Sequence, residues 1–180
     1  MKRPAAIAVL VAALAAGCGS KSSPTTTVTA IGQQQSRPAP PRAQQTSPAG
    51  LKSLSAKIGH PIYWIGKERR HKYELTKTSD GRVFVRYLPE DVQIGSKKAR
   101  FTIVGTYPVA NALDVLKKLA KRSGEKSFAA PHHGVAVFEA SRPTNVYVAY
   151  PGSSLQIEIF DPSPKRARKL VTHGKVEPVG

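Results

Sequence analysis

The sequence predicts an α+β domain, in which an antiparallel sheet carries two helices on one face. Within residues 61–160, several segments alternate apolar and polar side chains, which is the pattern of strands with one buried face. Two segments, near residues 111–124 and 161–173, instead repeat apolar residues at helical spacing. Because the chain has only 180 residues, it has room for one domain of this kind.

The first half of this domain predicts four strands with alternating or β-rich composition: residues 61–66, 73–78, 82–88 and 101–107. The second and third strands form a hairpin whose register can be argued. A three-residue loop with Gly81 in the left-handed region pairs Leu75 with Val85 and Glu74 with Arg86. We prefer this register to that of a two-residue loop, because it gives one apolar face and an opposite-charge pair on the other.

A helix from the N-cap Asn111 follows the first four strands, and Gly124 is its expected stop. The second half repeats the outline, with three strands and then a helix: residues 135–140, 145–150, 155–160 and 161–173. This repetition suggests a tandem β-β-β-α duplication, whose copies would be related by a pseudo-twofold rotation. Alternating valine and tyrosine is also simply good strand composition, so the alternative of two unrelated halves stays open.

The N-terminus has the features of a secretion signal. Lys2 and Arg3 precede an apolar run over residues 5–16, which is too short to span about 30 Å of hydrocarbon as a helix. Small residues then lead into Cys18, the only cysteine, so the chain cannot form an internal disulfide or a cysteine-based metal site.

This segment resembles the lipobox of bacterial lipoproteins, although Ala15 stands where leucine is usual. The resemblance implies a signal peptide over residues 1–17 and acylation of Cys18, with palmitate among the acyl chains. It also implies that the protein is anchored at the extracytoplasmic face of the cell membrane.

Residues 18–50 predict the lipidated cysteine and a disordered tether. Residues 19–50 contain five each of proline, serine, threonine and glutamine, with no aromatic or acidic residue. Residues 51–180 then form the single α+β domain. This domain is similar to uncharacterised lipoprotein domains of high-GC bacteria through three short motifs, which imply no activity: Gly-His-Pro-Ile-Tyr-Trp at 59–64, Gly-Thr-Tyr-Pro at 105–108 and Asp-Pro-Ser-Pro at 161–164.

The sequence predicts no catalytic residue, no metal site and no cofactor. His132 and His133 are adjacent, so on an extended chain they point to opposite sides, and no Asp, Glu or Cys lies within five residues of them. The Gly-x-Ser-x-Gly, zinc-protease and phosphate-loop motifs are absent from the sequence. Ser123 and Lys126 have the spacing of a serine–lysine motif, but they lie just past the expected end of a helix and lack the companion motifs. Of the neighbouring Tyr63 and Trp64, one must point away from the core, and we assign Trp64 to the core.

Charge is the remaining signal. The formal net charge is +17, and basic clusters occur near residues 67–72, 97–100, 117–122 and 165–169. Behind a lipoprotein signal, the available polyanions are anionic lipid headgroups and wall polymers rather than nucleic acid, and another envelope protein is a further candidate partner. The alternative is a solvated helix face. The candidate anion-binding residues lie on the two predicted helices: Lys117, Lys118, Lys121, Arg122, Lys165, Arg166, Arg168 and Lys169.

We therefore expect a membrane-anchored, extracytoplasmic lipoprotein whose small basic domain binds an envelope component and is not an enzyme. An envelope enzyme such as a cell-wall hydrolase is one alternative, and a structural spacer is another. A deep cleft with two convergent acids or a His–acid pair would favour the enzyme, whereas a shallow basic face would favour binding.

Overall fold

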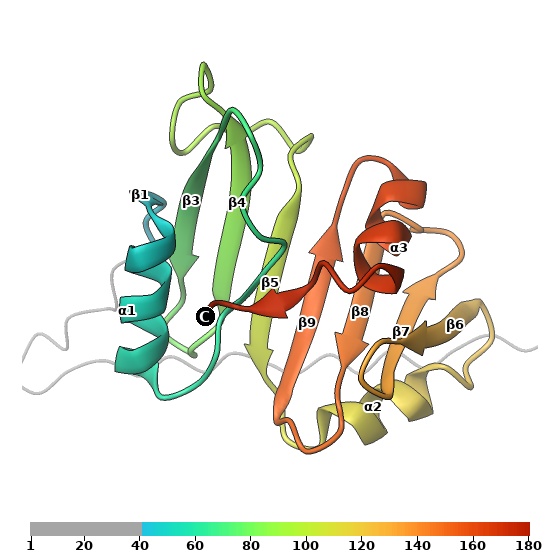
Figure 1. The fold of residues 1–180 in the computed structure, drawn as a ribbon. Coiled ribbons are helices and arrows are strands. Elements are labelled where there is room, and N and C mark those ends of the chain that lie inside the picture. Colours follow the sequence, from blue (N-terminus) through green and yellow to red (C-terminus); the bar gives the residue numbers. More distant parts are fainter. Residues whose placement is uncertain (1–40) are drawn as a thin grey trace, which may run out of the picture. The chain divides into compact units, whose positions relative to one another are not determined.

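The computed structural model describes residues 41–180, which belong to one compact unit (Figure 1). The expected signal peptide, Cys18 and most of the expected tether lie outside the described residues. Both hydrophobic cores and every described strand pairing lie within residues 41–180, so this part has what it needs to fold on its own. None of its helices combines the length and the apolar character that crossing a bilayer requires.

The antiparallel α+β fold predicted from the sequence is confirmed. The main sheet has the strand order β1-β3-β4-β5-β9-β8-β7-β6, and all its described pairings are antiparallel. Its strands are β1 (Gln44–Thr46), β3 (His71–Lys77), β4 (Val83–Pro89), β5 (Ile103–Pro108), β6 (Glu125–Ala130), β7 (Gly134–Glu139), β8 (Asn145–Ala149) and β9 (Leu155–Phe160). The expected first strand is only the short β2 (Tyr63–Trp64), and it pairs with β10 (Glu177–Pro178) rather than with the main sheet.

The predicted register of the β3–β4 hairpin is confirmed. Leu75 lies opposite Val85 and Glu74 lies opposite Arg86. The Thr78 amide donates to the Arg82 carbonyl at 2.9 Å, which closes a three-residue loop, and Gly81 has a φ of +84°. A side chain at this φ would be strained, so the glycine allows the turn that sets the register.

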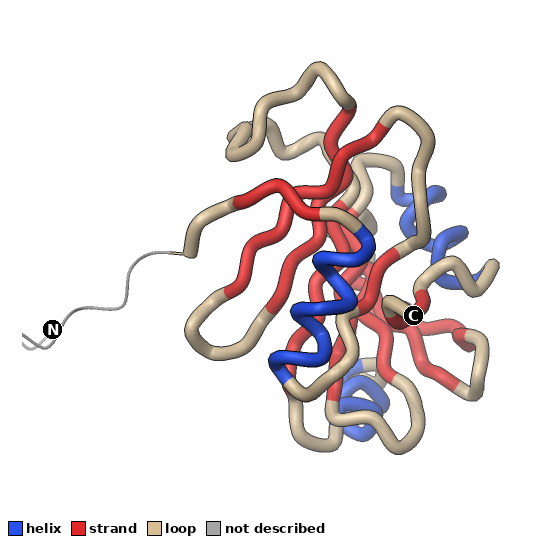
Figure 2. The backbone as a smooth tube through the Cα atoms, turned by 60° about the vertical axis from the view of Figure 1, so that its left-hand side comes forward, coloured by secondary structure: helices blue, strands red, loops and turns tan. Residues whose placement is uncertain are grey.

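The larger core lies on one face of the sheet, under α1 (Pro48–Ile58), α3 (Pro164–Thr172) and the β2–β10 ladder (Figure 1). Trp64 is buried in this core, with its ring edge against Tyr73, as expected. Figure 2 draws the helices in blue and shows that they lie apart from one another in space. The smaller core lies on the opposite face, where Ala112 and Leu116 of α2 (Ala112–Leu119) pack on Val137 and Ala149.

The expectation that the two predicted helices share a face is therefore wrong. Helix α3 does share a face with a second helix, but that helix is α1, and α2 lies on the other side. The reason is visible in β8, whose neighbouring residues Val148 and Ala149 are both fully buried, one in each core. Because this part of the sheet is apolar on both faces, it needs a helix on each.

The strand order agrees with the suggested duplication, but the helices do not. The sequence β3-β4-β5 is mirrored by β7-β8-β9 about the central β5–β9 pair. A rotation axis through an antiparallel pair and perpendicular to the sheet keeps each face on its own side. It would therefore place α2 and α3 on the same face, whereas they lie on opposite faces. The complete β-β-β-α unit is not repeated.

The folded domain begins before residue 51, which corrects the predicted end of the disordered tether. Gln44–Thr46 form edge strand β1, and α1 begins at Pro48. The Ser47 hydroxyl caps α1 by accepting from the Gly50 amide at 3.1 Å, and proline at the first turn costs no helical hydrogen bond. Helix α1 escaped prediction because Leu51 is its only fully buried residue, so its apolar stripe is weak.

Candidate functional site: a basic cleft beside helix α3

A cavity of about 340 Å³ opens beside the start of α3. Its basic lining residues are His71, Arg100 and Arg166. They come from the start of β3, from the loop before β5 and from α3, which are far apart in the sequence. Three of the four basic clusters in the sequence, near residues 67–72, 97–100 and 165–169, therefore meet around this basic cleft.

Asp161 fixes the inner end of the basic cleft. Its side chain is buried, with the residue 3% exposed. Oδ2 accepts from the Thr102 hydroxyl at 2.7 Å and from Arg166 Nη1 at 3.0 Å, while Oδ1 accepts from the Ser163 amide at 2.8 Å. These bonds join Thr102, just before β5, to the start of α3, so the wall that carries Arg166 is held in one position.

Arg166 spans the basic cleft and is not a free cation. Besides Asp161, its guanidinium binds Glu68, with 3.0 Å between Nη2 and Oε1. Two carboxylates thus surround one positive charge, which leaves no excess charge for a ligand. Arg166, a predicted anion ligand, thus ties the loop after β2 to α3 through its two ion pairs.

The loop that carries Arg100 is held by a buried ion pair. Glu74 and Arg86 lie opposite each other on β3 and β4, with 3.1 Å between Oε1 and Nη1. Arg86 also donates to the Ser96 carbonyl at 2.6 Å and to the Lys98 carbonyl. Its guanidinium lies 5.0 Å from the Phe101 ring centre, and that of Arg100 lies 5.7 Å from the same ring. The Glu74–Arg86 pair thus positions the loop that carries Arg100, while neither of its own residues lines the cleft.

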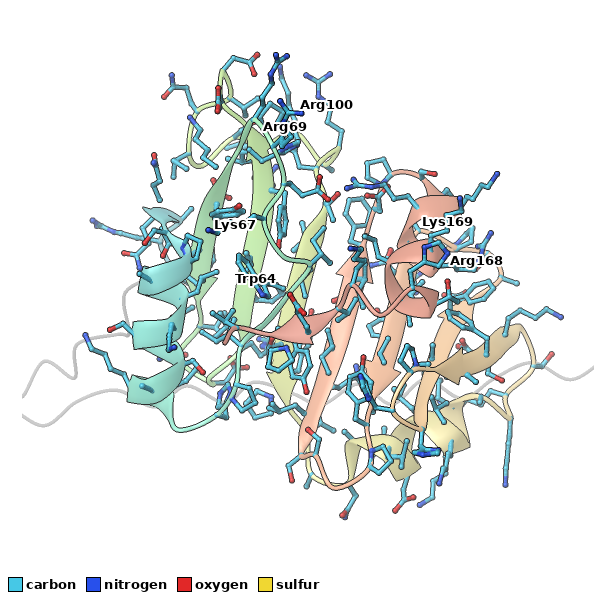
Figure 3. The ribbon with its side chains drawn as sticks, in the orientation of Figure 1. Trp64, Lys67, Arg69, Arg100, Arg168 and Lys169 are labelled. Carbon is cyan, nitrogen blue, oxygen red and sulfur yellow. The ribbon has the colours of Figure 1, made fainter. Side chains whose placement is uncertain are left out.

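The exposed cations of the three basic segments that meet at the cleft are largely uncompensated, although of these only Arg100 lines the cavity itself. Within residues 41–180, no carboxylate lies within ion-pair distance of these five exposed side chains: Lys67, Arg69, Arg70, Arg100 and Lys169. Figure 3 shows Arg69 and Arg100 at one end of the sheet and Lys169 on α3. Lys169 lies three residues after Arg166 and so shares its flank of the helix.

The predicted anion-binding residues do not form one surface. Lys117, Lys118, Lys121 and Arg122 belong to α2 and the turns after it, on the face opposite α3. On α3, Lys165 and Lys169 are exposed, but Arg168 is half-buried with its guanidinium 5.3 Å from the Phe138 ring centre. His71 and Arg100 belong to basic runs that are visible in the sequence. Only the fold shows that these two residues lie beside α3.

A second cavity, of about 370 Å³, lies near β2 and the β6–β7 turn and brings together Tyr63, Tyr150, His132, His133 and Glu177. The two tyrosine rings stack, with 5.9 Å between their centres, and burial raises the pKa of Tyr150 to about 12. Both histidines are exposed and have positive φ angles. Between Glu177 and either imidazole there is no hydrogen bond or ion pair, and residues 41–180 contain no group of three side chains that could hold a metal ion.

No protein-family model, curated protein or solved structure matches the chain. Its function is therefore inferred from its own residues.

Proposed function

We propose that this protein is a membrane-anchored, extracytoplasmic lipoprotein whose domain binds an anionic component of the cell envelope at the basic cleft. The observation that carries the proposal is the convergence of three basic segments around one cavity. Chance clustering of cations is expected in a basic chain, but here the walls are fixed by the buried Asp161 and by the Glu74–Arg86 pair. Such support preorganises a binding site.

The chemistry of the basic cleft suits phosphate groups. Arg100 lines the cleft and offers a guanidinium fork, which binds phosphate through paired hydrogen bonds. Arg69, Lys67 and Lys169 are exposed cations on the segments that supply its lining residues, and they add further positive charge. Charges exposed to physiological salt are screened beyond about 8 Å. The ligand must therefore contact these side chains directly, as a lipid headgroup or a phosphate-containing polymer would.

Binding is better supported than conversion of a substrate. General acid–base chemistry needs groups that are free to exchange protons with a ligand. The two carboxylates at the basic cleft, Asp161 and Glu68, are both engaged by Arg166. His71 also lines the cleft, but no hydrogen bond or ion pair joins its imidazole to either carboxylate. The envelope-enzyme and spacer alternatives thus have less support here than binding does.

Membrane anchoring rests on the lipobox-like segment that ends at Cys18. Each acyl CH₂ buried in the bilayer contributes about 0.8 kcal/mol, so two or more chains would hold the protein stably. An anchored domain meets headgroups and wall polymers at high local concentration. Even a weak phosphate site would then be occupied.

The test is vesicle co-sedimentation of residues 41–180. We expect binding to vesicles that contain phosphatidylglycerol, no binding to pure phosphatidylcholine, and loss of binding at high salt. Soluble polyphosphate, used as a competitor, should displace the domain if phosphate is the recognised group. Binding that is unaffected by salt, or no binding to either anionic probe, would contradict the proposal.

A matched pair of double variants separates a site from general charge. Arg100→Gln with Lys169→Gln removes one charge that lines the basic cleft and one that lies a turn after Arg166 on α3. Lys117→Gln with Lys118→Gln removes two charges from the opposite face. We expect the first pair to weaken binding at least tenfold and the second to change it by less than about threefold, since distant exposed charges are screened. Equal losses would mean that only the net charge matters.

A further inference from the structure

The face of the sheet opposite α3 contains a pocket that the basic cleft does not involve. It has a volume of about 270 Å³ and lies over the middle of the sheet, between β4, β5 and β9. Its lining is mainly apolar, from Phe84, Ile103 and Phe160, which are all half-buried. Helix α2 packs mainly on β7 and β8, so no helix covers the β4–β5 part of this face, where Ala99 of the loop before β5 lines the pocket. We call this cavity the Glu158 pocket, after its one carboxylate.

Gly105 makes the hollow possible. It lies between Phe84 on β4 and Glu158 on β9 in the ladder. A Cβ at this position would lie 2.7 Å from Cε2 of Tyr107, because the tyrosine ring lies against the bare glycine. The missing side chain thus gives the Tyr107 ring room, and it also leaves the middle of the sheet open.

Glu158 carries a negative charge into this apolar pocket. The Asn145 amide donates to Oε1 at 2.5 Å, and the Tyr107 hydroxyl donates to Oε2. A carboxylate offers about four lone-pair sites, so these two bonds leave acceptor capacity on both oxygens. In the part of the chain that the structure describes, no lysine or arginine lies within ion-pair distance of Glu158.

The lack of a cation is notable in such a basic domain. Residues 51–180 contain 23 basic and 11 acidic residues, so a carboxylate has many potential partners. A partly desolvated carboxylate is costly unless it is paired. The neutral groups around Glu158, namely Asn145, Tyr107 and the cross-strand neighbour Tyr147, compensate its charge only in part. A ligand that brings a positive charge would complete this site.

Aromatic rings form the rest of the pocket. Phe84 and Phe160 line it, and the Tyr107 ring meets Phe84 edge to face, with 5.6 Å between ring centres. Aromatic faces attract ammonium groups, and they also bury apolar carbon. The walls and the carboxylate therefore favour the same class of ligand.

We propose that the Glu158 pocket binds a small organic ammonium compound, with its charged head on Glu158 and its apolar body against Phe84 and Phe160. This site is independent of the basic cleft, since it takes a ligand of opposite charge on the opposite face of the sheet. The failure of either proposal leaves the other unaffected.

The test is an NMR titration of ¹⁵N-labelled residues 41–180 with four probes of similar size. Benzyltrimethylammonium and benzylammonium carry the positive charge, benzyl alcohol is neutral, and benzoate is negative. We expect both cations to shift the amide signals of Phe84, Gly105 and Glu158, and to bind at least tenfold more tightly than benzyl alcohol. Equal affinity for all four probes, shifts confined to other parts of the domain, or no saturable shifts would overturn the proposal.

Two variants identify the charge that matters. Glu158→Gln keeps the size of the side chain and should abolish the preference for cations while leaving benzyl alcohol binding unchanged. Glu125→Gln, on β6 outside the pocket, removes the same charge and should leave cation binding within about twofold. If Glu125→Gln weakens cation binding as much as Glu158→Gln does, the attraction is non-specific. If Glu158→Gln does not fold, the ranking of the four probes in the unmodified domain still decides.

Discussion

Arg86 on β4 donates from Nη1 to Oε1 of Glu74 on β3 at 3.1 Å, in a pair whose side chains are 14% and 5% exposed. The two residues also hold the loop before β5, since the Gly95 amide donates to Glu74 Oε2 at 2.5 Å and Arg86 reaches two loop carbonyls. The pair therefore links the edge half of the sheet to the loop that carries Arg100.

Glu74→Gln should destabilise the domain strongly. The substitution leaves the Arg86 charge largely buried and without its counter-charge, and breaking such a pair typically costs about 3–5 kcal/mol. Urea unfolding monitored by circular dichroism measures the change. Asp80→Asn, which removes the acid of the exposed Asp80–Arg82 pair, is the control and should have a much smaller effect. Equal effects would show that burial of the Glu74–Arg86 pair has no energetic importance.

Glu68→Gln should strengthen anion binding at the basic cleft. Glu68 balances part of the Arg166 charge, at 3.0 Å, so its neutralisation leaves that cation partly free. An exposed pair of this kind is worth ~1 kcal/mol or less, which corresponds to an increase in affinity of at most about fivefold. Vesicle co-sedimentation at low salt measures it. A weaker interaction would instead indicate that Glu68 contacts the ligand or holds the cleft open.

Alkaline pH should destabilise the domain through its buried tyrosines. Burial raises the pKa of Tyr150 to about 12 in the folded chain, against an ordinary value of 10.0. Between these values the unfolded chain loses a proton that the folded chain keeps, so the free energy of unfolding falls as the pH rises. The contribution is complete below pH 10 and is lost as the pH approaches about 12.

Tyr150→Phe removes this titration. In urea unfolding at pH values below and inside this window, the variant should therefore lose less stability with rising pH than the unmodified domain does. Tyrosinate absorbance at 295 nm provides an independent reading, because the folded domain should ionise its tyrosines later than the urea-unfolded chain. Coincident titration curves would contradict the assignment.

Cys18→Ser should abolish membrane anchoring. In bacteria grown with radiolabelled palmitate, the unmodified chain should take up the label and fractionate with membranes, because acylation needs the cysteine thiol. The serine variant should be unlabelled. Label that survives the substitution would show that the lipid is attached elsewhere, and the lipoprotein proposal would have to be abandoned.

Local chemistry explains which parts of the fold the sequence predicts well. The β3–β4 register follows from Gly81 and from the Glu74–Arg86 pair, which are close in sequence and require no knowledge of the rest of the fold. Edge strands β1 and β6 escaped prediction because they bury few side chains, so they lack a clear alternation. The face chosen by α2 also escaped, since the pattern of a helix says nothing about where it docks.

The candidate sites depend even more on long-range arrangement. Basic runs are visible in the sequence, but the meeting of His71, Arg100 and Arg166 follows from strand order and from the side of the sheet that α3 occupies. No sequence pattern predicts the Glu158 pocket, although Gly105 and Tyr107 belong to the short Gly-Thr-Tyr-Pro motif. The pocket arises from Gly105 and Glu158 facing each other across β5 and β9, two residues that are distant in sequence.

In the main sheet, the β5–β9 ladder alone joins the strands of the first half to those of the second. The basic cleft is lined by Arg100 from the first half and by Arg166 from the second, and the exposed Lys169 lies one turn after Arg166 on α3. An anion that contacts both Arg100 and Lys169 therefore bridges the two halves of the sheet. Its binding energy opposes their separation. By mass action, a saturating ligand should raise the melting temperature of the domain. Under the proposed function, an envelope surface rich in anions would stabilise the folded domain.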